Sequence, residues 1–142
     1  AGACRRATPD LVPGVVPGRD LLVVARALTA ETGGIVEANT LDLVPDHALL
    51  INVARGGHGI TDDLVAALAA GTIAGAALDV TDPEPLPDDH PLWSEPRCLV
   101  TPHVANTPEM GLDLLTPFVE DNVRRFLEGR PLLALVDIGL GY

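Results

Sequence analysis

The sequence contains no lysine, and its nine basic residues, all arginines, are outnumbered by 20 acidic residues, for a net charge of −11. Such an acidic surface repels phosphate backbones and anionic lipid headgroups. Aromatic residues make up only 3% of the chain, which leaves few platforms on which bases could stack. These shortages exclude nucleic acid and membrane as main partners.

Long hydrophobic runs are also missing, and none approaches the length that a membrane span needs. The first residues lack the basic start, apolar middle and cleavage site of a secretory signal peptide. The two cysteines, Cys4 and Cys98, have neither metal-site nor redox-motif spacing. We interpret them as ordinary reduced thiols and expect a cytoplasmic protein without a metal site.

At 142 residues, with 47% hydrophobic residues, the chain is long enough to bury the core of one domain. Residues 1–20 are rich in proline and glycine and lack periodicity, which predicts an irregular arm. Short apolar runs that end at turn residues are typical of buried parallel strands. The predicted strands cover residues 21–25, 48–53, 74–80 and 98–101.

Helical patterns fall between these strands. A short helical turn is expected over residues 40–44, and Thr61 is expected to cap a helix that ends near Gly71. Residues 81–96 hold five prolines, so they cannot be regular structure, and a loop of this length is often functional. Alternating strands and helices indicate an α/β fold with helices packed on a parallel sheet.

A long amphipathic helix is expected after the last strand. It should run from Pro108 to about residue 128, with a kink or a break at Pro117. Its predicted inner face is formed by Leu112, Leu115, Val119, Val123 and Phe126. With no internal repeat and no clear second domain, we assign residues 21–142 to one domain.

Polar groups follow the ends of successive predicted strands. Arg55 follows the second strand, Asp79 and then Glu84 follow the third, and His103 follows the fourth. In a parallel sheet these ends share one edge, where ligands bind, so the side chains are expected to converge. An imidazole exchanges protons near neutral pH, and a guanidinium binds a carboxylate at two points. The set suits a small 2-hydroxy or 2-keto acid, with Arg55 holding it, His103 handling the hydroxyl proton and Glu84 supporting His103.

Simpler explanations stay open for each of these residues. Arg55 could be a structural residue at a strand end, His103 could bond only to the backbone, and Glu84 could be solvated among the prolines. The other histidines lack comparable settings and are expected at the surface: His47, His58 and His90.

Four motifs occur in one order: NVARGG at 52–57, AALDV at 76–80 with EPLP at 84–87, LW at 92–93, and TPHVA at 101–105. With them, the stretch from about residue 21 to 142 resembles the C-terminal half of the NAD-binding domain of the D-isomer-specific 2-hydroxyacid dehydrogenases. The resemblance implies that Arg55, Glu84 and His103 match the family's catalytic Arg, Glu and His. It also implies a set of cofactor-binding positions, namely Ala27, Thr32, Val53, Ala54, Arg55, Asp79 and His103.

The resemblance implies an NAD(P)-dependent oxidoreductase that transfers a hydride between C4 of the nicotinamide and C2 of the acid. His103 would then act as the acid in reduction and as the base in oxidation. Arg5 and Arg6 resemble the position after the family's second strand, where basic residues tend to meet a 2′-phosphate. The expected cofactor is therefore NAD or NADP, with NADP suggested by this arginine pair.

The pattern also departs from the family. No G-x-G-x-x-G occurs, so the first βαβ unit with its glycine fingerprint is missing, as is the substrate domain. We expect a partial Rossmann-like sheet whose strand at 21–25 has a bare apolar edge that favours a homodimer. Two hypotheses stay open. One is an oxidoreductase that is active if a partner chain supplies the missing half; the other is a truncated, non-catalytic α/β remnant or fragment that acts only as a folding or pairing module.

Overall fold

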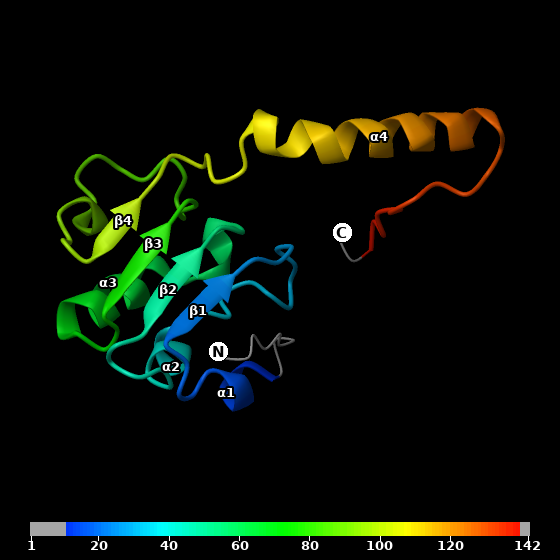
Figure 1. The fold of residues 1–142 in the computed structure, drawn as a ribbon. Helices are drawn as coiled ribbons and strands as arrows, with labels where there is room; N and C mark the ends of the chain where they lie inside the picture. Colours follow the sequence, from blue (N-terminus) through cyan, green and yellow to red (C-terminus); the bar gives the residue numbers. More distant parts are fainter. Residues whose placement is uncertain (1–10, 140–142) are drawn as a thin grey trace. The chain divides into compact units, whose positions relative to one another are not determined.

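A computed structural model describes residues 11–139 and divides the chain into two compact units, Ala1–His103 and Val104–Tyr142 (Figure 1). The predictions for Cys4, Arg5 and Arg6 lie outside the described residues. Within residues 11–139, no helix is both long and apolar enough to cross a membrane. The same residues contain no group of three or more His, Cys, Asp or Glu side chains that could hold a metal ion.

The first unit is built on a four-stranded sheet in the order β1-β2-β3-β4 (Figure 1). The strands are β1 (Leu21–Val24), β2 (Leu49–Asn52), β3 (Gly75–Leu78) and β4 (Cys98–Val100). Each neighbouring pair is parallel, so all four carboxyl ends lie at the same edge. The sheet confirms the predicted α/β, Rossmann-like fold. Each of the four predicted strands is present, β1 and β4 shortened at the carboxyl end and β2 and β3 at both ends.

The two faces of the sheet differ in burial. Successive strand residues point to opposite faces. On one face Leu50 and Leu78 belong to the core, whereas on the other Leu21, Leu49 and Leu99 expose 49%, 47% and 63% of their surface. The expectation that the run at 48–53 forms a strand buried on both faces is therefore wrong, because Leu49 is exposed. The helices that follow β1 and β2 cover this first face, because their residues Leu41 and Leu68 belong to the same core as Leu50 and Leu78.

Two helices follow β1 and β2, namely α2 (Ala38–Leu41) and α3 (Thr61–Ala70), and their side chains join the core. α3 confirms the helix predicted to end near Gly71, which closes it with a left-handed φ of 73°. Thr61 is not the cap. It is the first helical residue, and its hydroxyl donates instead to the Asp82 carbonyl oxygen at 2.5 Å. α2 begins and ends earlier than the turn expected over 40–44.

Over residues 11–20, the part of the predicted irregular arm that the structure describes, one short helix interrupts the irregular chain. Helix α1 (Val12–Val15) lies there, and Val16 is buried in the core. Pro13 falls in the first turn, where a proline costs no hydrogen bond, so its presence did not exclude a helix. The proline-rich loop 81–96 is irregular as expected, apart from the single 3-10 turn η3 (Pro91–Trp93).

The second unit, Val104–Tyr142, contains α4 (Pro108–Leu127). The predicted long helix is confirmed, and it runs through Pro117 without a break. The segment after it is tied back by Asn122, whose side chain accepts from the Leu133 amide at 2.8 Å. The predicted inner face of the helix is exposed, and the described part of this unit, residues 104–139, contains no other helix or strand against which it could pack.

Candidate active site at the carboxyl edge of the sheet

The shared carboxyl edge of the strands carries the residues that the sequence singled out (Figure 1). Val53 and Asp79 directly follow β2 and β3, while Ala27 and His103 each stand three residues beyond the end of β1 and β4. All of them belong to the first unit. The topology therefore brings segments that are far apart in the sequence to the carboxyl edge of the sheet, which we call the rim.

The turn after β2 is shaped by Asn52, a polar residue at the end of an apolar strand. Its side chain is buried, donates to the Arg55 carbonyl oxygen at 2.9 Å and accepts from the Ala54 amide at 3.1 Å. Because buried polar groups need partners, this amide closes the turn and fixes the backbone of Val53–Arg55. Arg55 itself is exposed at the rim, and its guanidinium donates to the Ala54 carbonyl oxygen at 2.6 Å.

Glu84 and His103 lie in direct contact, with Oε1 of the carboxylate 2.7 Å from Nδ1 of the imidazole. This hydrogen bond is the main cause that lowers the pKa of Glu84 below its ordinary value. The Thr81 amide and the positive charge of Arg55 lower the pKa of Glu84 further, whereas burial opposes them. The carboxylate and the imidazole thus lie in contact on the rim, and the charge of the Arg55 guanidinium acts on the same carboxylate.

His103 has an unusual backbone conformation, with a left-handed φ of 57°. Side chains with a Cβ rarely adopt this region, and such positions cost about 1–2 kcal/mol. The bond from the His103 amide to the Thr101 carbonyl oxygen, 3.0 Å long, helps to hold the turn. The imidazole is therefore directed by a constrained backbone as well as by Glu84.

Asp79 is buried beneath the rim. Its carboxylate accepts a 2.6 Å hydrogen bond from the Thr101 hydroxyl, which joins the ends of β3 and β4. Its amide donates to the Asn52 carbonyl oxygen at 3.0 Å, which continues the pairing with β2. Asp79 therefore ties three adjacent strands together at the rim.

The loop after β1 is held from within by Thr32. The Thr32 hydroxyl is buried, donates to the Ala27 carbonyl oxygen at 2.9 Å and accepts from the Thr29 amide at 2.8 Å. Ala27, in contrast, is exposed. Of the two positions predicted in this loop, one reaches the surface and the other supports the loop from below.

His58 corrects the sequence analysis, which expected it at the surface. It lies in the 3-10 turn η2 (Gly56–His58), has no exposed surface, and places its two ring nitrogens against backbone carbonyl oxygens. His47 is exposed as expected, and a hydrogen bond that its ring donates to the Asp20 carboxylate raises its pKa. His90 is half-buried, with Nδ1 accepting from the Leu92 amide.

Sequence reasoning gave no role to Asn52 and misplaced His58. The role of Asn52 could have been predicted, because a polar residue at the end of an apolar strand must find hydrogen-bond partners for its side-chain amide. His58 left none, because its more distant partner lies 31 residues away and only the fold brings the two together.

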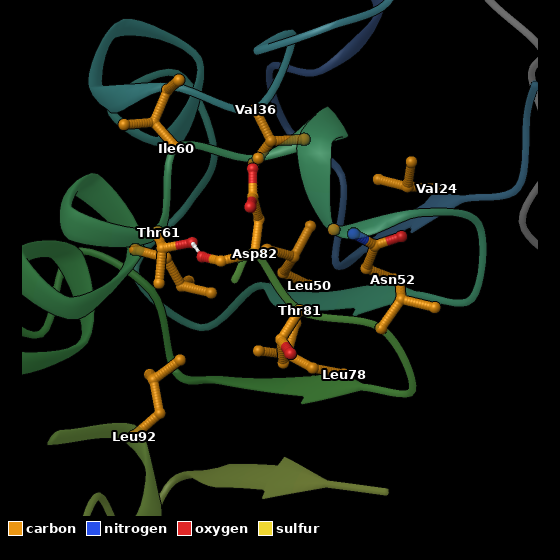
Figure 2. A pocket seen from close by; sticks show the side chains of 14 residues that line it. Val24, Val36, Leu50, Asn52, Ile60, Thr61, Leu78, Thr81, Asp82 and Leu92 are labelled. Atoms are coloured by element: carbon orange, nitrogen blue, oxygen red, sulfur yellow. Dashed lines mark hydrogen bonds between the residues drawn. The ribbon is translucent and has the colours of Figure 1, made fainter. Parts of the chain in front are cut away.

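A pocket lies beside this rim, between the covered face of the sheet and the start of α3 (Figure 2). Its wall includes Val24, Leu50 and Leu78 from the sheet and Leu64 from α3. Arg55, Glu84 and His103 are not among the residues that line it. Because its lining is mainly apolar and lacks these groups, we place the candidate chemistry at the rim and not in this pocket.

Comparison with known proteins identifies the sequence pattern independently. Residues 6–105 match the family model described as "D-isomer specific 2-hydroxyacid dehydrogenase, NAD binding domain". Glyoxylate/hydroxypyruvate reductase A of Yersinia enterocolitica is 37% identical over 143 aligned residues, which span 99% of this chain and 44% of that protein.

Two solved structures are similar in fold and sequence. A D-isomer specific 2-hydroxyacid dehydrogenase from Xanthobacter autotrophicus Py2, in complex with NADPH and MES, is 41% identical with a TM-score of 0.83, covering 94% of this chain and 54% of that one. An NADPH-dependent glyoxylate/hydroxypyruvate reductase from Sinorhizobium meliloti, in complex with NADP and sulfate, is 33% identical with a TM-score of 0.84, covering 94% and 43%. The chain spans about two fifths of the length of the curated relatives that it matches.

Proposed function

The chain belongs to the D-isomer specific 2-hydroxyacid dehydrogenase family through its NAD-binding domain, and from this membership we propose that it serves hydride transfer between a nicotinamide cofactor and C2 of a 2-hydroxy or 2-keto acid. One observation carries the proposal. A carboxylate and an imidazole lie 2.7 Å apart at the sheet edge, and the charge of a nearby guanidinium acts on the same carboxylate.

His103 is the proposed acid and base. Its Nδ1 is occupied by Glu84, so Nε2 is the nitrogen proposed to give a proton to the substrate oxygen in reduction and to take it back in oxidation. The Glu84 carboxylate orients the ring and stabilises the charged imidazole. The exposed guanidinium of Arg55 is proposed to bind the substrate carboxylate at two points.

The nicotinamide, when bound, carries the hydride at C4, and the protein orients it. Residues that fit its binding lie on the same rim. Ala27 and Val53 are exposed there, and Ala54 sits in the turn fixed by Asn52. Asp79 and Thr32 are buried below, so we propose that they act mainly by holding the rim in place. No glycine fingerprint occurs in these 142 residues, so this fit covers the nicotinamide end of the dinucleotide.

A preference for NADP over NAD is proposed from Arg5 and Arg6, with support from the two similar structures that contain NADP or NADPH. A charge-assisted hydrogen bond is worth about 1.5–3 kcal/mol. The double variant Arg5→Ala/Arg6→Ala should therefore weaken NADPH binding at least about tenfold while leaving NADH binding unchanged. Arg130→Ala is the matched control, since it removes an arginine from the other unit. Equal loss for both cofactors would contradict the assignment.

Cofactor titration tests the function itself. Nicotinamide fluorescence is followed as NADH or NADPH is added to the chain, and turnover is assayed with glyoxylate and hydroxypyruvate. His103→Ala should abolish turnover and leave most dinucleotide binding intact, whereas His47→Ala, at an exposed histidine, should change neither. No fluorescence change with either cofactor at millimolar concentrations would favour the non-catalytic α/β module instead.

A further inference from the structure

His58 is a fully buried histidine that the proposed chemistry does not use. It has no exposed surface, with Nδ1 3.0 Å from the Arg55 carbonyl oxygen and Nε2 3.2 Å from the Ala27 carbonyl oxygen. Carbonyl oxygens only accept, so each contact is a hydrogen bond when the facing ring nitrogen carries a proton. One ring therefore spans two backbone segments that are 28 residues apart in the sequence.

The two segments are also joined by their backbones. The Gly34 amide donates to the Gly57 carbonyl oxygen, the Val36 amide to that of His58, and the Ile60 amide to that of Val36, each at 2.9 Å. Val36 and Gly59 form a parallel bridge. The imidazole of His58 adds contacts to Ala27 and Arg55, two residues that these backbone bonds do not reach.

We propose that His58 is a positioning residue that holds the loop after β1 and the turn after β2 in one arrangement. This inference rests on the proposed function, because Ala27 belongs to the proposed cofactor contacts and Arg55 is the proposed substrate-binding residue. If the ring is lost, the carbonyl oxygen to which it donates loses a buried partner, and the backbone must move to find another. This movement would displace the loop after β1 and the turn after β2 together.

A buried ring could instead serve only to fill space. Two variants separate these roles. His58→Phe keeps an aromatic ring of similar bulk but removes the ring nitrogens and with them the N–H donor, whereas His58→Gln keeps an amide that can donate to one of the carbonyl oxygens. His47→Gln is the matched control, because His47 is exposed and its partner is the Asp20 carboxylate.

Native-state hydrogen exchange on the 142-residue chain is the test. In His58→Phe the amides of Gly34, Val36 and Ile60 should exchange about tenfold faster, the change expected for losing about one net hydrogen bond, while amides of α3 and β3 keep their rates. His58→Gln should recover part of the protection. Unchanged exchange, or an equal increase across the whole sheet, would overturn the positioning role. The wild-type chain gives a second readout, because ring protons that donate to buried carbonyl oxygens give slowly exchanging downfield proton signals in water. Absence of any such signal from His58 would also overturn it.

Dinucleotide binding separates this inference from the proposed function. If the wild-type chain binds NADH or NADPH, folded His58→Phe should bind it about tenfold more weakly, and an unchanged affinity would overturn the inference. If the wild-type chain binds neither, the proposed function fails, and the exchange pattern alone decides whether His58 holds the two segments.

Discussion

At Gly56, a single added methyl group should displace the backbone at the rim and destabilise the fold. A Cβ built on it would lie 1.9 Å from the Thr81 carbonyl oxygen, 2.1 Å from the Thr81 carbonyl carbon and 2.6 Å from the Asp82 nitrogen. Its φ is outside the left-handed region, so the obstacle is purely steric. Gly56→Ala therefore tests whether the turn after β2 and the segment after β3 touch through their backbones.

The size of the effect follows from these distances. Ordinary contact with a Cβ begins at 3.4 Å, so the two backbones must separate by about 1.5 Å. Overpacking of a tight interior costs about 1–3 kcal/mol, and a clash with backbone belongs at the upper end or beyond. We expect Gly56→Ala to lower the free energy of unfolding by about 3 kcal/mol, which corresponds to a Tm lower by roughly 10 °C.

Gly57→Ala is the matched control. Its Cβ would meet the Leu28 Cδ2 atom at 3.1 Å, the end of a flexible side chain that can rotate away. We expect a cost below about 1 kcal/mol. Urea denaturation of both variants measures the difference directly. If Gly56→Ala is within about 0.5 kcal/mol of Gly57→Ala, the close approach of the two segments is wrong.

Three further perturbations probe other parts of the chain. His103 lowers the pKa of Glu84, so this carboxylate stabilises the fold fully above its ordinary pKa of 4.5, and the contribution is lost as pH falls through the lowered value. Glu84→Gln should make the urea midpoint less sensitive to acid below pH 4.5, and an unchanged pH dependence would contradict the contact. Burial raises the pKa of Cys98 to about 11 from 9.0. In a variant with Cys4 replaced by serine, a thiol reagent should therefore react with Cys98 about 100-fold more slowly than with a model thiol. An equal rate would refute the burial of this thiol. Gly71→Ala, at a φ of 73°, should lower the free energy of unfolding in urea by about 1 kcal/mol. Gly14→Ala in α1, where a Cβ would meet open space, should lower it far less. Equal losses of stability would argue against the left-handed cap at Gly71.

The strands and the long helices could be predicted because their signals are local. β1 to β4 each contain a short apolar run, and Gly71 marks the end of α3 as expected. Burial could not be predicted in the same way. A continuous apolar run such as that around Leu49 is the same whether one face of the strand is covered or both. The start of α3 could not be predicted either, because it depends on a distant partner. The Thr61 hydroxyl donates to the Asp82 carbonyl oxygen and therefore does not cap the helix.

Part of the candidate site could be predicted from order alone. Once four parallel strands are expected, Glu84 and His103 must fall near one edge, and the structure places them in contact. The groups beneath them could not be predicted, because their partners are backbone atoms. His58 bonds to a carbonyl oxygen 31 residues away, and no property of its side chain signals that pairing. Asn52 was detectable in principle from its polar character at a buried strand end.

The contrast between the exposed and the buried polar groups indicates what holds the rim in place. The side chains of Glu84 and His103 are 42% and 45% exposed, and exposed ion pairs contribute only about 0–1 kcal/mol. Their 2.7 Å contact is therefore too weak to fix the segments that carry it, and is better seen as a result of their placement. Below them lies a layer of buried, hydrogen-bonded side chains, formed by Thr32, Asn52, His58 and Asp79. Losing a partner there leaves a buried group unsatisfied, at about 1–3 kcal/mol each. The geometry of the candidate site thus depends more on this layer than on the residues proposed to perform the chemistry.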